Sequence, residues 1–181
     1  MLRVFLGIKI SQELYKRIKK LTEKYKNLPV RWIDEKSSHL TLVPPWNIQS
    51  NEVDKIIKEL KTVQRKFHPF KLKFSQISYG PDPKHPRLIW VMGMASKEMI
   101  ELKRSASLAL GRKEEKREFI PHLTLARFQA KDYRLPIIPE LNEKITWEEK
   151  VDNFNLFESR LLRSGALYNS LHQFKFLNNL H

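Results

Sequence analysis

Apolar and polar residues alternate along several segments of the chain. This pattern predicts β-strands, because successive side chains of a strand point to opposite faces. Residues 3–10 form the first such segment. After Ser11, a residue type that caps helices, apolar positions recur at helical spacing through residues 12–27. Asn27 and Pro29 then end the predicted helix.

The same two patterns continue to the end of the chain. Two more helices are predicted over about 52–66 and 97–111, the second with Ser96 as N-cap and Gly111 as C-cap. The Pro-rich residues 44–51 predict a loop. Further strands are predicted over 30–33, 39–43, 70–80, 86–94, 119–128, 146–162 and 166–176.

The predicted elements alternate throughout the chain, and no low-complexity linker divides it. We therefore expect one domain, residues 1–181, built as two interleaved lobes. A unit of one helix followed by one strand occurs twice, although the flanking sequences of the two copies differ. Two copies are too few for a solenoid, so this repetition indicates pseudo-symmetry within the domain.

The tetrapeptide His-Leu-Thr-Leu ends each copy of the repeated unit, at residues 39–42 and 122–125. On a strand, residues two apart share a face, so His39 and Thr41 point one way and the leucines point the other. His122 and Thr124 follow the same rule. One such tetrapeptide would be ordinary strand sequence. Two copies in separate strands favour a pair of functional half-sites.

A histidine beside a threonine on a solvated face has a clear chemistry. Imidazole exchanges protons near neutral pH, and a threonine hydroxyl donates a hydrogen bond to a phosphoryl oxygen. Two such pairs would hold a phosphate from both sides, with one histidine deprotonating water and the other protonating a leaving oxygen. Neither copy has a carboxylate at ligand spacing, so no metal is expected.

Composition narrows the function classes. Lys and Arg number 34 against 20 Asp and Glu, a net charge of +14 that favours a polyanionic partner. A basic proteome or a hot habitat would explain the same excess. The absence of cysteine excludes disulfides, thiolate catalysis and zinc on cysteine ligands. No apolar run is long enough to cross a bilayer, and the first ten residues lack a signal-peptide cleavage site.

The paired motifs resemble the two-histidine (2H) phosphoesterases, which are defined by two His-x-Thr-x sequences. Within that superfamily the chain is most similar to the RNA 2',3'-cyclic phosphodiesterases, also called 2'-5' RNA ligases. The resemblance extends almost from end to end. It includes VRWIDEKSSHLTL, HPRLIWVMG, FIPHLTLARF and the closing ESRLLRSGALYNSLHQFKF.

The resemblance implies a reaction and roles for individual residues. Such enzymes open a 2',3'-cyclic phosphate to a 2'-phosphomonoester without metal or nucleotide cofactor. His39 would be the proton donor and His122 the proton acceptor, while Thr41 and Thr124 would hold phosphate oxygens. Arg127 matches the arginine that binds phosphate after the second motif. The Val-Pro-Pro-Trp that follows the first motif departs from the family pattern.

Three further residues are candidates for binding phosphate or substrate. Strict alternation places Arg127 on the leucine face, so it reaches the phosphate only if the strand ends or bulges near Ala126. Trp46, in the predicted loop, is the better candidate for stacking on a nucleobase, and Trp32 is expected to be structural. Phe5 lies on the strand face opposite Val4 and would line the cleft.

These observations predict an α+β, bilobal, pseudo-symmetric fold in which two antiparallel sheets line a central cleft and helices pack outside. The predicted function is hydrolysis of 2',3'-cyclic phosphate ends of RNA, or of cyclic nucleotides. Two alternatives stay open: an ATP-independent 2'-5' ligase that joins tRNA halves, and a non-catalytic RNA- or nucleotide-binding module. We expect a cytoplasmic monomer with no cofactor, no metal and no membrane association.

Overall fold

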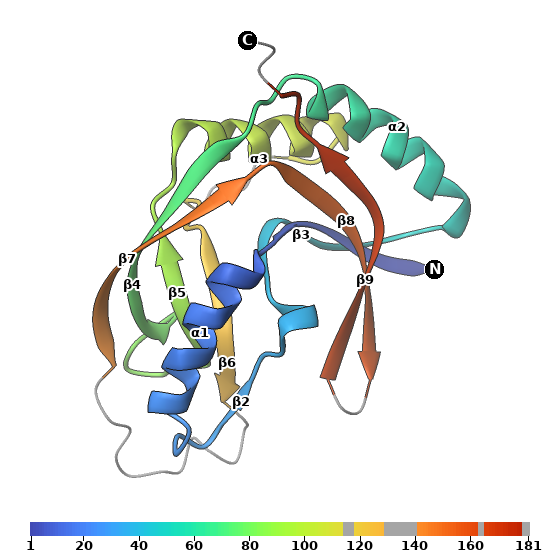
Figure 1. The fold of residues 1–181 in the computed structure, drawn as a ribbon. Coiled ribbons are helices and arrows are strands. Elements are labelled where there is room, and N and C mark those ends of the chain that lie inside the picture. Colours follow the sequence, from blue (N-terminus) through green and yellow to red (C-terminus); the bar gives the residue numbers. More distant parts are fainter. Residues whose placement is uncertain (114–117, 129–140, 163–164, 179–181) are drawn as a thin grey trace.

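Strands dominate the structure, a computed structural model that describes residues 1–113, 118–128, 141–162 and 165–178 (Figure 1). The strands are β1 (Leu2–Lys9), β2 (Val30–Trp32), β3 (His39–Ile48), β4 (Phe70–Gly80), β5 (Leu88–Gly93), β6 (His122–Phe128), β7 (Asn142–Val151), β8 (Asn153–Leu162) and β9 (Gly165–Lys175). The helices are α1 (Gln12–Lys24), α2 (Val53–Gln64) and α3 (Lys97–Ala109). Two short 3-10 helices are η1 (Glu35–Ser37) and η2 (Ser50–Glu52).

The strands form one antiparallel sheet in the order β7-β4-β5-β6-β3-β1-β8-β9. Strand β2 lies off this path and pairs with residues 126–128 of β6, beyond the residue that pairs with β3. Among the described residues, the two halves of the sheet are joined where Leu40 of β3 pairs with Leu123 of β6. The α+β class is therefore as predicted. The two separate sheets expected from the sequence are instead two halves of one sheet, because this single pair joins them.

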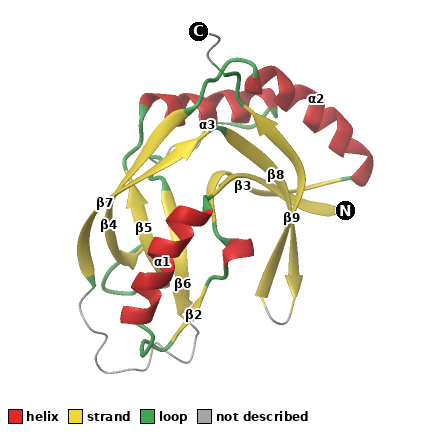
Figure 2. Ribbon diagram, in the orientation of Figure 1, coloured by secondary structure: helices red, strands yellow, loops and turns green. Residues whose placement is uncertain are grey.

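Each helix packs outside the strands (Figure 2). Helix α1 follows β1 but contacts β7, in the other half of the sheet. Helices α2 and α3 contact each other, and they also contact β9 and β3 respectively. Ser11 fixes the start of α1 twice: its hydroxyl accepts from the Leu14 amide at 3.1 Å, and its own amide and hydroxyl donate to the buried Glu149 of β7.

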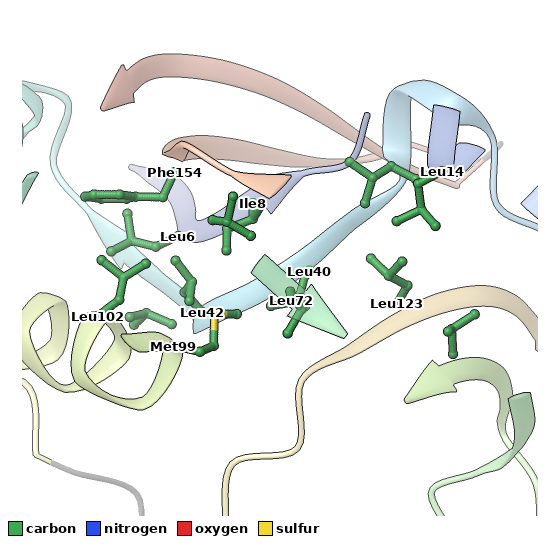
Figure 3. Packing of buried hydrophobic residues seen from close by; sticks show 14 of the residues in the cluster. Leu6, Ile8, Leu14, Leu40, Leu42, Leu72, Met99, Leu102, Leu123 and Phe154 are labelled. Atoms are coloured by element: carbon green, nitrogen blue, oxygen red, sulfur yellow. The ribbon is translucent and has the colours of Figure 1, made fainter. Parts of the chain in front are cut away.

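The core lies between the helices and the sheet, where both motif leucines of each copy are buried (Figure 3). Leu40 and Leu42 are each 1% exposed, and Leu123 and Leu125 are each 2% exposed. Burial of this size stabilises each leucine by about 1.5–3 kcal/mol relative to an exposed position. The leucine face of both motif strands is thus tied to the core, which leaves the opposite face for the site.

Most predicted elements are present, with two corrections. The predicted loop 44–51 is wrong as far as Ile48, because β3 continues through Pro44 and Pro45. Neither proline has a partner in the β1–β3 register, so the missing proline N–H groups interrupt none of its pairs. The single strand predicted over 146–162 is two strands, β7 and β8, separated at Asp152.

Candidate active site

Both His–Thr pairs line one pocket. His39 and Thr41 reach it from β3, and His122 and Thr124 reach it from β6. The pocket encloses about 250 Å³. The prediction that the two motifs form one site is therefore supported by where the structure places all four side chains.

The register of the two strands gives the site an approximate twofold symmetry. Leu40, between His39 and Thr41, pairs with Leu123, between His122 and Thr124, and the strands run antiparallel. In an antiparallel pair, the residue before one partner faces the residue after the other. His39 therefore lies on the side of Thr124, and His122 lies on the side of Thr41.

Each imidazole is anchored by the backbone two residues before it. His39 Nδ1 lies 2.7 Å from the Ser37 carbonyl oxygen, and His122 Nδ1 lies 2.9 Å from the Ile120 carbonyl oxygen. A carbonyl only accepts, so Nδ1 carries a proton in both rings. The Nε2 atom of each neutral ring is left as the acceptor, which suits proton exchange with a group in the pocket.

Helix η1 positions the carbonyl that holds His39. Its N-cap is Asp34, whose carboxylate accepts from the Ser37 amide at 2.7 Å. The Ser38 hydroxyl donates to the Asp34 carbonyl at 2.8 Å. These bonds fix the turn that enters β3, and with it the direction of the Ser37 carbonyl.

The surroundings of His39 disfavour its charged form. Burial lowers the pKa of His39 from 6.5 to about 4, and the nearby Arg127 and His122 act in the same direction. The hydrogen bond to the Ser37 carbonyl opposes this shift without cancelling it. These surroundings therefore favour the neutral form of His39 at neutral pH.

A β-bulge brings Arg127 to the site. Ala126 pairs with Ile89 of β5 while Thr124 pairs with the next residue, Trp90, so Leu125 is the extra residue on β6. Leu125 and Ala126 are consequently both buried, and the alternation changes phase. Arg127 then falls on the face of His122 and lines the pocket. The condition set by the sequence, a bulge near Ala126, is met.

Arg31 is a second cation at the pocket, and it was not predicted from the sequence. It lies directly opposite Arg127 in the β2–β6 register, and both side chains line the pocket. Like charges placed opposite each other on neighbouring strands repel. A bound anion relieves that repulsion, so the pair favours an anionic ligand at this end of the pocket. The cross-strand pairing that reveals it is absent from local sequence.

Two predicted substrate contacts are not in the pocket. Phe5 is only 1% exposed and lies beneath His39, with ring centroids 4.7 Å apart, so it supports the histidine. Trp46 lines a separate groove beside α2 and the end of α3, where Arg112 stacks on its ring at 5.0 Å. It pairs with the buried Val4, which places it on the core side of the sheet.

Two aromatic residues do line the pocket. Trp32 of β2, which we expected to be structural, is half-buried there. Tyr168 of β9 also lines it, and its ring meets that of His39 edge-on at 4.7 Å. Tyr168 belongs to the closing segment that carries the family resemblance, but nothing in the local pattern shows that β9 reaches the pocket.

Among residues 1–113, 118–128, 141–162 and 165–178, no group of three His, Asp or Glu side chains is arranged to hold a metal ion. None of the described helices is long and apolar enough to cross a membrane.

An antiparallel sheet that brings one His-x-Thr strand from each half to a shared pocket defines the class of two-histidine phosphoesterases. Comparison of the chain with known families agrees with this class. The family described as the 2'-5' RNA ligase superfamily matches residues 10–161. Because that match covers most of the sequence, the chain belongs to this family.

Curated relatives of similar length carry one name. The RNA 2',3'-cyclic phosphodiesterase of Aquifex aeolicus is 26% identical over 184 residues, which cover 95% of this chain and 96% of the relative. The RNA 2',3'-cyclic phosphodiesterase of Methanocaldococcus jannaschii is 25% identical, with 92% and 96% covered.

Solved structures share the fold. A Thermus thermophilus protein superposes with a TM-score of 0.83 at 20% identity, covering 98% of this chain and 100% of its own. Escherichia coli LigT in complex with 3'-AMP superposes with a TM-score of 0.75 at 22% identity, covering 97% and 98%.

Proposed function

We propose that this protein is an RNA 2',3'-cyclic phosphodiesterase that hydrolyses 2',3'-cyclic phosphate ends to 2'-phosphomonoesters. The observation that carries the proposal is the shared pocket: two His–Thr pairs and two arginines surround a space that fits a phosphate group. The names of the relatives in Aquifex aeolicus and Methanocaldococcus jannaschii support the same reaction.

The phosphate is bound before any bond changes. The hydroxyls of Thr41 and Thr124 donate to its non-bridging oxygens, one from each half of the sheet. Arg127 and Arg31 offset its negative charge from β6 and β2. This arrangement stabilises the additional charge that develops on the oxygens as water attacks the phosphorus.

Proton transfer follows from the placement of the two histidines. His122 Nε2 accepts a proton from water as the water oxygen bonds to phosphorus. The bond from phosphorus to the 3'-oxygen then breaks, and His39, which must be protonated at Nε2 for this step, donates a proton to that oxygen. The 2'-oxygen keeps the phosphate. The antiparallel motif strands support transfer from two sides, because they approach the phosphate from the two halves of the sheet. Which histidine is the acid and which the base follows the resemblance to the family.

The two histidines, two threonines and two arginines provide the proton transfers and the phosphate contacts, so we propose activity as a monomer without metal or nucleotide cofactor. The absence of cysteine is compatible with a reducing cytoplasm, where we propose that the protein acts on RNA ends.

The test is product analysis on 2',3'-cyclic AMP and on an oligonucleotide ending in a 2',3'-cyclic phosphate. We expect a 2'-phosphate product from both. His39→Ala and His122→Ala should each lower turnover by about 10²–10⁴-fold, the usual contribution of one general acid or base. His85→Ala is the matched control, because His85 is exposed and paired with Asp82 outside the pocket.

Two outcomes would contradict the proposal. Near-normal turnover by either His39→Ala or His122→Ala would remove the two-histidine mechanism. Binding of the oligonucleotide without turnover would favour a non-catalytic RNA-binding module. Incubating cleaved tRNA halves without ATP tests the remaining alternative, in which a 5'-hydroxyl replaces water as the group that attacks the cyclic phosphate. More 2'-5' linked product than 2'-phosphate would show that joining predominates.

A further inference from the structure

The two catalytic histidines have different neighbours, and the difference lies mainly in aromatic rings. His39 contacts Phe5 with centroids 4.7 Å apart, Tyr168 at 4.7 Å and Phe157 at 6.1 Å. Phe5 also lies 5.0 Å from Phe157 and 5.0 Å from Tyr168, so the three rings form one cluster. Beside His122 lies the ring of Trp90, at 5.0 Å.

The cluster comes from three strands on the side of the sheet away from β6. Phe5 belongs to β1, Phe157 to β8 and Tyr168 to β9. Phe5 is 1% exposed and Phe157 is 5% exposed, so water is excluded from that side of His39. An imidazolium there would lose hydration without a compensating anion.

The charged groups around His39 also disfavour its protonated form. Among the described residues, the side chains that line the pocket with His39 or pair with it across the sheet include several cationic or titratable groups and one carboxylate, which caps η1. These groups are Lys9 on β1, Arg31 on β2, Asp34 before η1, His122 and Arg127 on β6, and the Tyr168 phenol on β9. Positive charge predominates, so a proton on His39 is opposed by its neighbours until a negative charge enters the pocket.

We propose that Tyr168, together with Phe5 and Phe157, is a positioning residue that keeps His39 neutral in the empty pocket, and that an anionic phosphoryl group brings His39 to its protonated state. This inference rests on the proposed function, because only a proton donor has to be charged before the reaction. The proton comes from solvent, and its charge is balanced by that of the bound phosphate.

The energetic direction agrees with the geometry. Burial and the charges of Arg127 and His122 lower the pKa of His39 to about 4. A bound anion acts against both causes, since it offsets the arginine charge and gives the imidazolium a partner. The acid is then formed where a phosphate lies and is absent from an empty site.

The direct test measures the pKa of His39 by NMR on the full-length protein with labelled histidine. His39→Gln identifies the His39 signal by its loss. One titration uses sodium chloride and the other sodium sulfate at equal ionic strength, because sulfate resembles a phosphoryl group and does not itself titrate near neutral pH. We expect the pKa of His39 to rise by at least about one unit in saturating sulfate.

A matched pair of variants tests the role of the Tyr168 ring. Tyr168→Phe keeps the ring and removes the hydroxyl, so the pKa of His39 should stay low in chloride. Tyr168→Ser removes the ring and admits water, so the same pKa should rise by about one unit and the response to sulfate should shrink. A purely structural role of Tyr168 would not separate these two variants by pKa.

Three outcomes overturn the inference. They are a His39 pKa near its ordinary value in the wild type, a value that saturating sulfate does not move, and equal values in the Ser and Phe variants. The wild-type titration does not depend on Tyr168→Ser, so it decides even if that variant fails to fold. A turnover assay on the same samples separates the two proposals. A rise of the His39 pKa in sulfate without turnover would reject only the proposed phosphodiesterase activity. Turnover without that rise would reject only the proposed protonation of His39 by a bound anion.

Discussion

Gly7 of β1 lies at the closest approach between β1 and the first motif strand. A Cβ atom added there would stand 2.9 Å from the Leu40 carbonyl oxygen and 3.2 Å from the Phe5 ring. A non-bonded contact to carbon is comfortable from about 3.4 Å, so Gly7→Ala requires a movement of about half an ångström. The carbonyl belongs to the backbone and cannot rotate away, so β3 itself must shift.

The shift has a structural and a functional consequence. Overpacking of this kind costs about 1–3 kcal/mol, and each kcal/mol lowers the Tm of a chain this size by about 2–4 °C. Leu40 stands between His39 and Thr41, so the same movement displaces both side chains from the phosphate. A misplacement of about 1 Å costs about 10²-fold in rate, so half of that should lower kcat about tenfold.

The assay is kcat on 2',3'-cyclic AMP together with Tm. Gly111→Ala is the control: Gly111 has a φ of 63°, and the residue follows α3 outside the pocket. Apart from its chain neighbours, no atom of the described residues lies within 4 Å of the added Cβ. This variant should lose about 1 kcal/mol of stability through backbone strain and keep its kcat. If Gly7→Ala kept normal kcat, or if both variants lost it equally, the spacing of β1 and β3 would not be what holds the site in place.

Three shorter predictions concern charge, pH and the far groove. Arg127→Gln should raise KM for a cyclic-phosphate oligonucleotide by about 10–100-fold, whereas Arg87→Gln, which removes the same charge from a residue outside the pocket, should change it little; equal effects would indicate general electrostatics. Because the pKa of His39 is lowered to about 4, its contribution to stability is present above the unfolded value of about 6.5 and is lost as pH falls towards 4. The free energy of unfolding should therefore fall across that window by up to about 3 kcal/mol more in the wild type than in His39→Gln, and equal slopes in urea titrations would refute the shift. Trp46→Leu should lower Tm and leave kcat unchanged, since Trp46 stacks with Arg112 away from the pocket. A loss of kcat would show that Trp46 contributes to the active site after all.

Much of the fold follows from local patterns in the sequence. Strand β4 has the predicted bounds, 70–80, and Ser11 and Ser96 cap their helices as expected. The two motifs were also predictable, because alternation on a strand requires buried leucines on one face and the His–Thr pair on the other. These features depend on residues near each other along the chain.

The features that the sequence did not predict depend on which strands pair with each other. Arg31 lies at the pocket because β2 pairs with β6. Tyr168 lies there because β9 pairs with β8, which in turn pairs with β1. The local periodicity of the sequence predicts neither pairing. The loop predicted after the first motif failed for a related reason. Two prolines normally interrupt a central strand, but here they fall where β3 and β1 are out of register.

The bulge that follows each motif explains how a repeated tetrapeptide produces unequal half-sites. On β3, Val43 pairs with Leu6 and Thr41 with Gly7, which makes Leu42 the extra residue. On β6 the extra residue is Leu125, at the equivalent position of the second motif. In both strands the phase of alternation changes after the final leucine, so each bulge directs the second residue after it toward the His–Thr face.

That second residue is Pro44 in the first copy and Arg127 in the second. The proline is not among the residues that line the pocket, whereas the arginine lines it and brings a guanidinium that also disfavours a proton on His39. Two imidazoles in equal surroundings would share a single proton equally, so neither would be fixed as the acid. The symmetry of the strands therefore supplies the acid and the base. The departures from symmetry, an aromatic cluster beside His39 and an arginine after the second motif, distinguish the two histidines.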